Sequence, residues 1–213
     1  MGVQNEFLRV EYGLNRLLWQ DPDQDQLDVW SVSLQAGQLL AESDRDVRWE
    51  SIAWALLYAM DVDRWIRLGQ RPFDVADADS ADAAYYYEHV FDVHGEFQLD
   101  VVEQFEWPPN RALFLDDVRV EPECRRKGYA SVLVADALLT LATHGTAVFA
   151  HPGPTDLGPD GEDDVTRLRS ETQNTRFLGA LGFVPFRERL WVLDLATENA
   201  IERLAAIRRA DGG

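Results

Sequence analysis

The 213-residue chain has little cysteine, little positive charge and no long apolar run. Its single cysteine, Cys124, excludes an intramolecular disulfide framework and a zinc site built from several thiolates. No apolar run approaches the roughly 20 residues of a membrane-spanning helix. The first residues, MGVQNEFLRVEYG, lack the basic segment followed by an apolar one that marks a protein for export. These absences predict a cytoplasmic protein with no membrane partner.

The shortage of positive charge also bears on the partners of the protein. The chain carries 38 acidic and 20 basic residues, a formal charge of −18, and Lys127 is its one lysine. Nucleic acids and anionic membranes are bound by surfaces rich in Lys and Arg, so this balance argues against both and favours a cationic partner. Residues 1–110 hold 22 acids and 7 bases, a net of −15, whereas residues 111–213 hold 16 acids and 13 bases, a net of −3. Genomic composition or salt adaptation would explain the same bias without any partner.

The chain does contain enough apolar material for a core. Its hydrophobic fraction is 46%, with ten Phe, seven Trp and six Tyr, so we exclude wholesale disorder and predict one domain over residues 1–213. Period-two alternation predicts the strands at 29–34 and 96–105, a run rich in apolar residues predicts the strand at 111–120, and apolar residues at helical spacing predict helices. The expected strands are 29–34, 96–105, 111–120, 146–150, 184–187 and 190–195, and the expected helices are 47–60, 84–91, 129–142, 167–181 and one from Thr197. Three Pro, three Gly and five acids predict a loop over 151–164.

The strongest local motif lies between the strand at 111–120 and the helix at 129–142. It reads VRVEPECRRKGYA, from Val118 to Ala130. A helix that begins near Gly128 points its N–H groups and the positive end of its dipole outward, which suits a pyrophosphate. The glycine permits close approach of the backbone, and neighbouring bases add charge-assisted hydrogen bonds to phosphate oxygens; these bases are Arg125, Arg126 and Lys127. The alternative is that the bases only solvate a loop.

The spacing of Arg125, Gly128 and Ala130 resembles the acetyl-CoA signature of the GNAT family of N-acetyltransferases. That signature runs Arg or Gln, two residues, Gly, one residue, Gly or Ala. The VRVEP exit of the preceding strand, the LGFVPF segment at 181–186 and the order of elements are also similar to the family. The resemblance implies an α/β (α+β) fold with a mixed, mostly antiparallel central sheet, splayed at the cofactor cleft and flanked by helices. It divides the single domain into an acceptor-side part, an acetyl-CoA-binding core and a C-terminal helix, at residues 1–110, 111–195 and 196–213.

The resemblance also implies an activity, the transfer of an acetyl or short acyl group from acetyl-CoA to a primary amine, with no metal. It implies that backbone groups of Val118 and Val120 bind the pantetheine arm and that an amide near Val118 polarises the thioester carbonyl. The remaining implied cofactor contacts are Arg125, Arg126, Lys127, Gly128, Tyr129, Ala130 and Asn174. The acceptor would be cationic, either an amine-bearing small molecule such as an aminoglycoside or polyamine, or a basic protein terminus.

An acceptor amine must lose a proton before it attacks, so a base is needed within reach. Asp116 and Asp117 directly precede Val118, and one of the two should face the cleft; an acid exposed at a strand edge is the alternative interpretation. His151 follows the second cofactor strand and titrates near neutrality, so it is either a further candidate or a solvated loop histidine. Cys124 lies in the phosphate loop, away from the thioester, and is expected to be inert.

Two positions depart from the family pattern. Leu178 stands where many members carry the tyrosine that protonates the leaving thiolate. Glu171 stands where they carry a helix-starting asparagine, and Asn174 lies three residues later. Leu178 favours an alternative function, a catalytically weak GNAT-fold protein that binds acyl-CoA or serves as a regulatory partner. A third interpretation, an acidic mimic of DNA, leaves the basic loop without a role.

Aromatic and histidine residues of the N-terminal half carry weaker signals. Three consecutive aromatics, Tyr85, Tyr86 and Tyr87, are expected to bury one or two rings in the core, although they could also line an acceptor pocket. His89 and His94 are five residues apart, which does not place them on one helical face, so we expect no metal site. The sequence leaves the acceptor, the acyl chain length and the oligomeric state open.

Overall fold

The computed structural model describes residues 7–15, 27–39, 47–68, 81–153, 164–187 and 189–210. The strands are β1 (Phe7–Asn15), β2 (Leu27–Leu39), β3 (Val47–Asp61), β4 (Arg111–Val120), β5 (Thr146–Ala150), β6 (Val184–Arg187) and β7 (Leu190–Asp194). The helices are α1 (Val62–Leu68), α3 (Ala81–Val90), α4 (Leu99–Val102), the 3₁₀ turn η1 (Pro122–Cys124), α5 (Tyr129–Leu141), α6 (Asp164–Leu181) and α7 (Glu198–Ala210). None of the helices within these ranges is long and apolar enough to cross a membrane.

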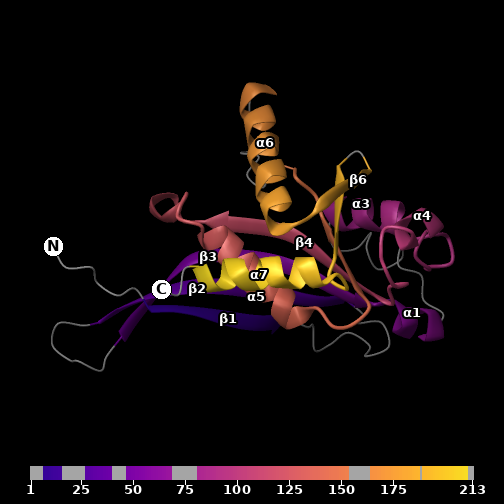
Figure 1. The fold of residues 1–213 in the computed structure, drawn as a ribbon, viewed down its shortest axis with the longest axis horizontal. Helices are drawn as coiled ribbons and strands as arrows, with labels where there is room; N and C mark the ends of the chain where they lie inside the picture. The colour runs from indigo at the N-terminus through magenta and orange to yellow at the C-terminus, as the bar shows by residue number, and fades with distance from the viewer. Residues whose placement is uncertain are drawn as a thin grey trace.

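The strands form one seven-stranded sheet in the order β1-β2-β3-β4-β5-β7-β6, drawn in Figure 1. In the described part of the chain, every neighbouring pair is antiparallel except β4 and β5, which run parallel. A parallel pair needs a crossover connection, and α5 provides it. The architecture is therefore mixed α/β with a mostly antiparallel sheet and flanking helices, in agreement with the coarse fold class predicted from the sequence.

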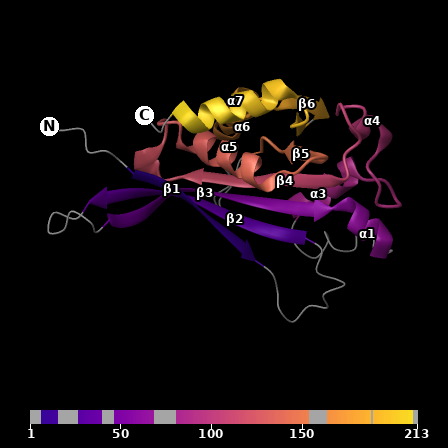
Figure 2. The same cartoon turned by 60° about the horizontal axis from the view of Figure 1, so that its bottom comes forward.

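One face of the sheet is covered by α5 and α7 (Figure 2). There β3 presents small residues, Ala53, Ala55 and Ala59, on either side of the fully buried Leu57. Small side chains on the strand leave room for the larger residues of α5, among them the fully buried Leu133. Burying a leucine of this kind contributes about 1.5–3 kcal/mol, so the crossover helix is held chiefly by its apolar face.

The opposite face of the sheet carries an aromatic cluster beneath α1 and α3. The rings of Phe114 (β4) and Phe149 (β5) have centroids 5.3 Å apart, and Tyr86 of α3 lies 4.9 Å from Phe114. Trp65 of α1 stacks on Tyr87 at 6.0 Å. All five rings are at most 3% exposed, so aromatic burial holds α1 and α3 against the sheet. The burial of Tyr86 and Tyr87 confirms that two of the three consecutive tyrosines pack in the core.

Most of the predicted elements are confirmed. The strands expected at 29–34, 111–120, 146–150, 184–187 and 190–195 correspond to β2, β4, β5, β6 and β7, and four expected helices correspond to α3, α5, α6 and α7. Helix α6 ends at Leu181, and Gly182 then adopts the left-handed conformation with φ of +103°, a common helix stop. Residues 154–163 of the predicted loop lie outside the described residues.

The helix predicted over 47–60 is wrong, because these residues form β3. The prediction relied on the helical spacing of apolar residues such as Leu56 and Met60. In the sheet, the face of β3 turned away from α5 also carries apolar side chains, including Trp54 and Tyr58. When both faces of a strand are apolar, the period-two signal disappears from the sequence.

The strand predicted over 96–105 is also wrong. Phe97 makes one isolated β-bridge, and α4 follows it directly. The predicted alternation would bury Leu99 between Phe97 and Val101, but Leu99 is 76% exposed and Val101 is fully buried. The residues that pack on the aromatic cluster are spaced four apart, at Phe97, Val101 and Phe105. That spacing suits a helical turn better than a strand.

Candidate functional site

Strands β4 and β5 separate halfway along β4. Their parallel register runs from Arg111 opposite Thr146 to Leu115 opposite Ala150, where β5 ends. Strand β4 continues to Val120, and β5 does not extend alongside this last part. Two of the predicted proton acceptors, Asp116 and His151, are therefore the first residues on either side of the point where the strands separate.

A β-bulge lies at the same place on the β3 side of β4. Leu57 of β3 pairs with Leu115, whereas the preceding Leu56 pairs with Asp117, so Asp116 is an extra residue in β4. A bulge of this kind bends the strand and reverses the alternation of side chains beyond it. The end of β4 is thus set apart from the regular sheet on both of its sides.

The bulge decides which side chains at the end of β4 face α5. Val118 and Val120 pack against the apolar cluster beneath α5, so Asp117 and Arg119 lie on the opposite face. There Nε of Arg119 forms an ion pair with Oδ2 of Asp117 at 2.7 Å. The side chain of Asp117 is 20% exposed and that of Arg119 is 44% exposed, so the carboxylate is the more enclosed partner.

The hydroxyl of Tyr86 forms a hydrogen bond with β4 at the point where β4 and β5 separate. It donates a 3.1 Å hydrogen bond to the carbonyl of Leu115, the last residue of β4 in register with β5. Both residues are buried, and a buried carbonyl without a donor would cost about 1–3 kcal/mol. A residue of α3 therefore stabilises the strand end that continues into the candidate site.

The loop after β4 turns through two residues with positive φ. Arg126 has φ of +65° and Gly128 has φ of +87°. Gly128 is the N-cap of α5, and its carbonyl accepts hydrogen bonds from the N–H groups of Ser131 and Val132 at 2.9 and 3.2 Å. The half-buried Ala130 follows in the first turn of α5. When residues in the left-handed conformation alternate with residues of negative φ, successive backbone N–H groups point to one side. This geometry binds anions.

Three bases surround this loop, and all three are exposed: Arg125, Arg126 and Lys127. Nε of Arg125 donates a 3.0 Å hydrogen bond to the carbonyl of Val120. Nζ of Lys127 lies 5.9 Å from the ring centroid of Tyr129, whose side chain is buried. The positive charge therefore gathers at the N-terminus of α5, where the helix dipole adds to the attraction for an anion.

His151 is held in one orientation at the end of β5. The N–H group of Gly153 donates a 2.9 Å hydrogen bond to Nδ1 of His151. Because a backbone N–H can only donate, Nδ1 carries no proton and the neutral ring is protonated at Nε2. Tyr85 packs edge-on against this ring at 5.2 Å and stacks on His89 at 4.1 Å. In this arrangement Nδ1 of His151 is a hydrogen-bond acceptor and Nε2 is a donor.

Helix α6 carries two positions discussed from the sequence. Nδ2 of Asn174 donates to the carbonyls of Gly153 at 2.7 Å and Pro152 at 3.4 Å, so Asn174 ties α6 to the segment that holds His151. Leu178 is 3% exposed and belongs to the apolar cluster beneath α5, so core packing accounts for an apolar residue there. A cofactor contact by Asn174 stays a prediction.

The sequence analysis did not single out Arg119, and it named Tyr85 and Tyr86 without predicting the contacts that they make here. Arg119 has a detectable signal, because it lies two residues from Asp117 on a strand and therefore shares its face. The hydrogen bond from Tyr86 to Leu115 joins residues 29 positions apart in the sequence. Tyr85 and His151 are further apart still, so no local sequence pattern could predict either contact.

No metal centre is found within the described ranges, because no group of three or more His, Cys, Asp or Glu side chains is arranged to hold an ion. Cys124 is half-buried and packs against the apolar cluster beneath α5. Comparison with protein-family models, with curated proteins and with solved structures finds no match for the chain. Function has to be inferred from the geometry of β4, β5 and the β4–α5 loop.

Proposed function

We propose that this protein is a GNAT-type acyltransferase that moves an acetyl or short acyl group from acyl-CoA to a primary amine. The observation that supports it most is the separation of β5 from β4 beyond Leu115, directly upstream of a basic, left-handed loop that opens α5. Backbone groups at such a strand end can bind an extended, amide-containing ligand, and the loop suits a diphosphate. Acetyl-CoA combines both features, since its amide-rich pantetheine arm ends in phosphates.

In this proposal the pantetheine arm lies along the end of β4. Backbone groups of Val118 and Val120 bind it, and an N–H near Val118 polarises the thioester carbonyl while the amine attacks the carbonyl carbon. The exposed side chains of Arg126 and Lys127 bind phosphate oxygens. Arg125, which bonds the Val120 carbonyl, fixes the junction between strand and loop. CoA leaves as its thiolate, and the amine proton passes to a base.

The geometry favours an aspartate over His151 as that base. Nδ1 of His151 accepts the bond from Gly153, and Nε2 carries the ring proton, so neither nitrogen offers a lone pair for the amine proton. Asp116 lies where β4 and β5 separate, and Asp117 is largely enclosed one residue further on. We assign the proton-accepting role to this pair and leave His151 as a hydrogen-bond donor.

The negative charge of the N-terminal half favours a cationic acceptor. Residues 1–110, with a net charge of −15, supply β1 to β3 and the helices before β4. A negative field over this half raises the local concentration of cationic amines. The acceptors to test first are therefore polyamines, aminoglycosides and peptides with a basic N-terminus.

The phosphate-binding role is tested by calorimetry with CoA and with pantetheine, which lacks the phosphates. The Arg126→Gln/Lys127→Gln variant should bind CoA at least about tenfold more weakly, because hydrogen bonds to charged groups contribute about 1.5–3 kcal/mol each. Its affinity for pantetheine should not change. The matched control is Arg64→Gln/Arg67→Gln, which removes two exposed arginines from α1 and should bind both ligands as the wild type does. Absence of CoA binding to the wild type, or an equal loss in both variants, would overturn the proposal.

The chemical step is tested by the release of CoA from acetyl-CoA in the presence of the three amine classes. Asp116→Asn or Asp117→Asn should lower kcat by about 10²–10⁴-fold, the usual contribution of a general base, with the affinity for acetyl-CoA retained. His151→Gln should keep most of the activity. If the wild type binds acetyl-CoA but none of the tested amines causes the release of CoA, the acyltransferase assignment is wrong. The second candidate below then takes its place.

The second candidate is a protein of the same fold that binds acyl-CoA without turnover. One observation favours it: Leu178, at the position where many family members carry a catalytic tyrosine, is buried in the core and offers no proton donor. A thiolate is a tolerable leaving group that water can protonate, so this substitution alone does not abolish transfer. The turnover measurement above distinguishes the two candidates.

A further inference from the structure

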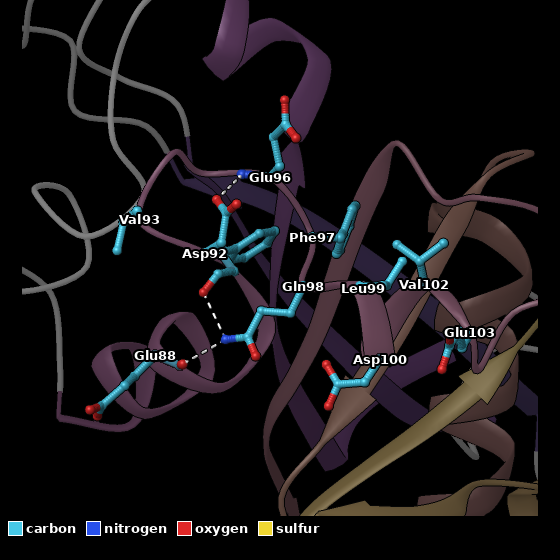
Figure 3. A pocket seen from close by; sticks show the side chains of 11 residues that line it. Glu88, Asp92, Val93, Glu96, Phe97, Gln98, Leu99, Asp100, Val102 and Glu103 are labelled. Carbon is cyan, nitrogen blue, oxygen red and sulfur yellow. Dashed lines mark hydrogen bonds between the residues drawn. The ribbon is translucent and has the colours of Figure 1, made fainter.

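A groove lies between α3 and α4, far from the basic loop. It is a shallow depression of about 890 Å³ that is open to solvent. Residues of α3, of the turn at 91–98 and of α4 line it, as Figure 3 shows. In Figures 1 and 2, α4 and the β4–α5 loop lie at opposite ends of the molecule. The groove is therefore separate from the basic loop, whereas its α3 wall also carries Tyr85 and Tyr86 of the candidate site.

Hydrogen bonds hold the walls of this groove in place. Nε2 of Gln98 donates to the carbonyls of Glu88 at 3.1 Å and Phe91 at 2.9 Å. Arg187 of β6 donates to the Gln98 side chain at 2.9 Å and forms an ion pair with Asp100. Its other nitrogen donates to the carbonyl of His89 at 2.7 Å. The end of α3, the turn and α4 are thus fixed to each other and to the sheet, and the groove is preformed.

Apolar side chains of the groove are unusually exposed. Val93 is 81% exposed and Leu99 is 76% exposed, the two highest values among the large hydrophobic residues that the structure describes. Both line the groove together with the half-buried Phe97. Val93 and Leu99 lie on opposite sides of the groove, with Phe97 between them (Figure 3), so a partner that covers both has to span the groove.

The ionisable side chains that line the groove carry charge of one sign only. Its ionisable residues are all acidic: Glu88, Asp92, Glu96, Asp100 and Glu103. Asp92 is occupied by backbone N–H groups of its own turn, and Asp100 pairs with the arginine of β6. Glu88, Glu96 and Glu103 are exposed. Within the part of the chain that the structure describes, these three carboxylates carry no ion-pair partner.

We propose that this groove docks a cationic, amphipathic polypeptide segment. Its apolar side chains cover Val93 and Leu99, and its Lys or Arg side chains pair with Glu88, Glu96 and Glu103. Charge complementarity sets the choice of partner, because a second copy of this chain brings a formal charge of −18 and would be repelled. A small polyamine would match the carboxylates but leave the apolar side chains uncovered. The inference does not depend on acyl transfer.

The test uses fluorescence anisotropy with labelled, end-capped short peptides of simple repeat. A peptide of alternating Lys and Leu should bind the full-length protein, whereas a Glu–Leu peptide and a Lys–Ser peptide should bind at least about tenfold more weakly. The Glu88→Gln/Glu96→Gln/Glu103→Gln variant should also lose about tenfold in affinity for the Lys–Leu peptide, since exposed ion pairs contribute about 0.2–1 kcal/mol each. All three glutamates are exposed, so this variant should fold as the wild type does.

Matched controls separate the groove from the general acidity of the protein. Glu50→Gln/Glu198→Gln/Glu202→Gln removes the same charge from exposed positions elsewhere and should bind the Lys–Leu peptide as tightly as the wild type. Leu99→Ala should weaken binding several-fold, whereas Ile201→Ala, at another exposed apolar residue, should not. Equal losses in the two glutamate variants, equal binding of the Lys–Ser peptide, or no binding of the Lys–Leu peptide would each overturn the proposal.

Discussion

A hydrogen bond of Tyr12 and an ion pair of Arg208 meet at Asp136 and join three elements. Tyr12 lies on the edge strand β1, and its hydroxyl donates to Oδ2 of Asp136 on α5 at 2.5 Å. Nε of Arg208 on α7 pairs with the other oxygen of Asp136 at 3.0 Å. Burial raises the pKa of Tyr12 well above its usual value, and the hydrogen bond to the Asp136 carboxylate raises this pKa further. The phenol therefore stays neutral in the folded protein over a pH range in which it ionises when unfolded.

This difference in pKa predicts a loss of stability at high pH. Above about pH 10, the usual pKa of tyrosine, the unfolded chain releases the Tyr12 proton and the folded chain retains it. The stabilisation is complete below that pH and is lost as the pH rises above it. The free energy of unfolding of the wild type should therefore fall more steeply than that of Tyr12→Phe. The difference should stay below about 1.4 kcal/mol per pH unit, the limit for one proton, because Tyr12 is only partly buried.

Urea unfolding of both proteins between pH 8 and pH 11, a range chosen around the usual tyrosine pKa of about 10, measures this difference. Other tyrosines and the arginines titrate equally in the two proteins, so subtracting one curve from the other isolates Tyr12. Parallel curves across the range would show that the environment of Tyr12 does not raise its pKa.

At the scale of elements, two glycines near the end of α6 differ in whether their backbone conformation needs a glycine. Gly179 lies within α6, and a Cβ added there meets nothing within 4 Å. Gly182 follows the helix with φ of +103°, and a Cβ added there lies 3.2 Å from Nη1 of Arg203. A glycine costs helix stability at the first position, whereas the second requires a conformation that other residues rarely adopt.

The same substitution should therefore have opposite effects at these two positions. Gly179→Ala should raise the free energy of unfolding by about 0.5–1 kcal/mol, the usual preference for Ala over Gly in a helix. Gly182→Ala should lower it by about 1–2 kcal/mol, the cost of the left-handed conformation for a residue with a Cβ. The unfolded chain changes equally in both variants, so their difference in urea unfolding reports the folded state alone. Effects of the same sign would contradict the assignment of the helix end.

Local patterns could predict the part of the chain that carries the candidate site. Strand β4 was predicted from its run of apolar residues between a Pro-rich turn and a polar loop, and helix α5 from glycine and helical spacing. Strand β3 could not be predicted, because Trp54 and Tyr58 make its second face apolar. The β-bulge at Asp116 was equally hidden, since it depends on the register with β3. Contacts such as Tyr86 with Leu115 arise only from the tertiary fold.

At the scale of the whole molecule, the excess of acids has a definite distribution. The half with a net charge of −15 contains the acidic groove between α3 and α4. The exposed bases Arg125, Arg126 and Lys127 lie at the opposite end of the molecule, around the start of α5 (Figure 1). A polyanion and a cationic partner would therefore approach opposite ends, and each proposed ligand meets a surface of opposite charge.

The excess of acidic residues also predicts that salt stabilises the fold. With a formal charge of −18, repulsion between carboxylates opposes the compact state more than the expanded one. Raising the ionic strength from about 0.01 M to about 0.15 M shortens the screening length from about 30 Å to about 8 Å. The free energy of unfolding should then rise by about 1 kcal/mol. Urea, which is uncharged, is the suitable denaturant, and choline chloride in place of sodium chloride separates screening from sodium binding. Equal gains in the two salts are expected, whereas a fall with salt would mean that attractive ion pairs, such as Arg208 with Asp136, outweigh the repulsion.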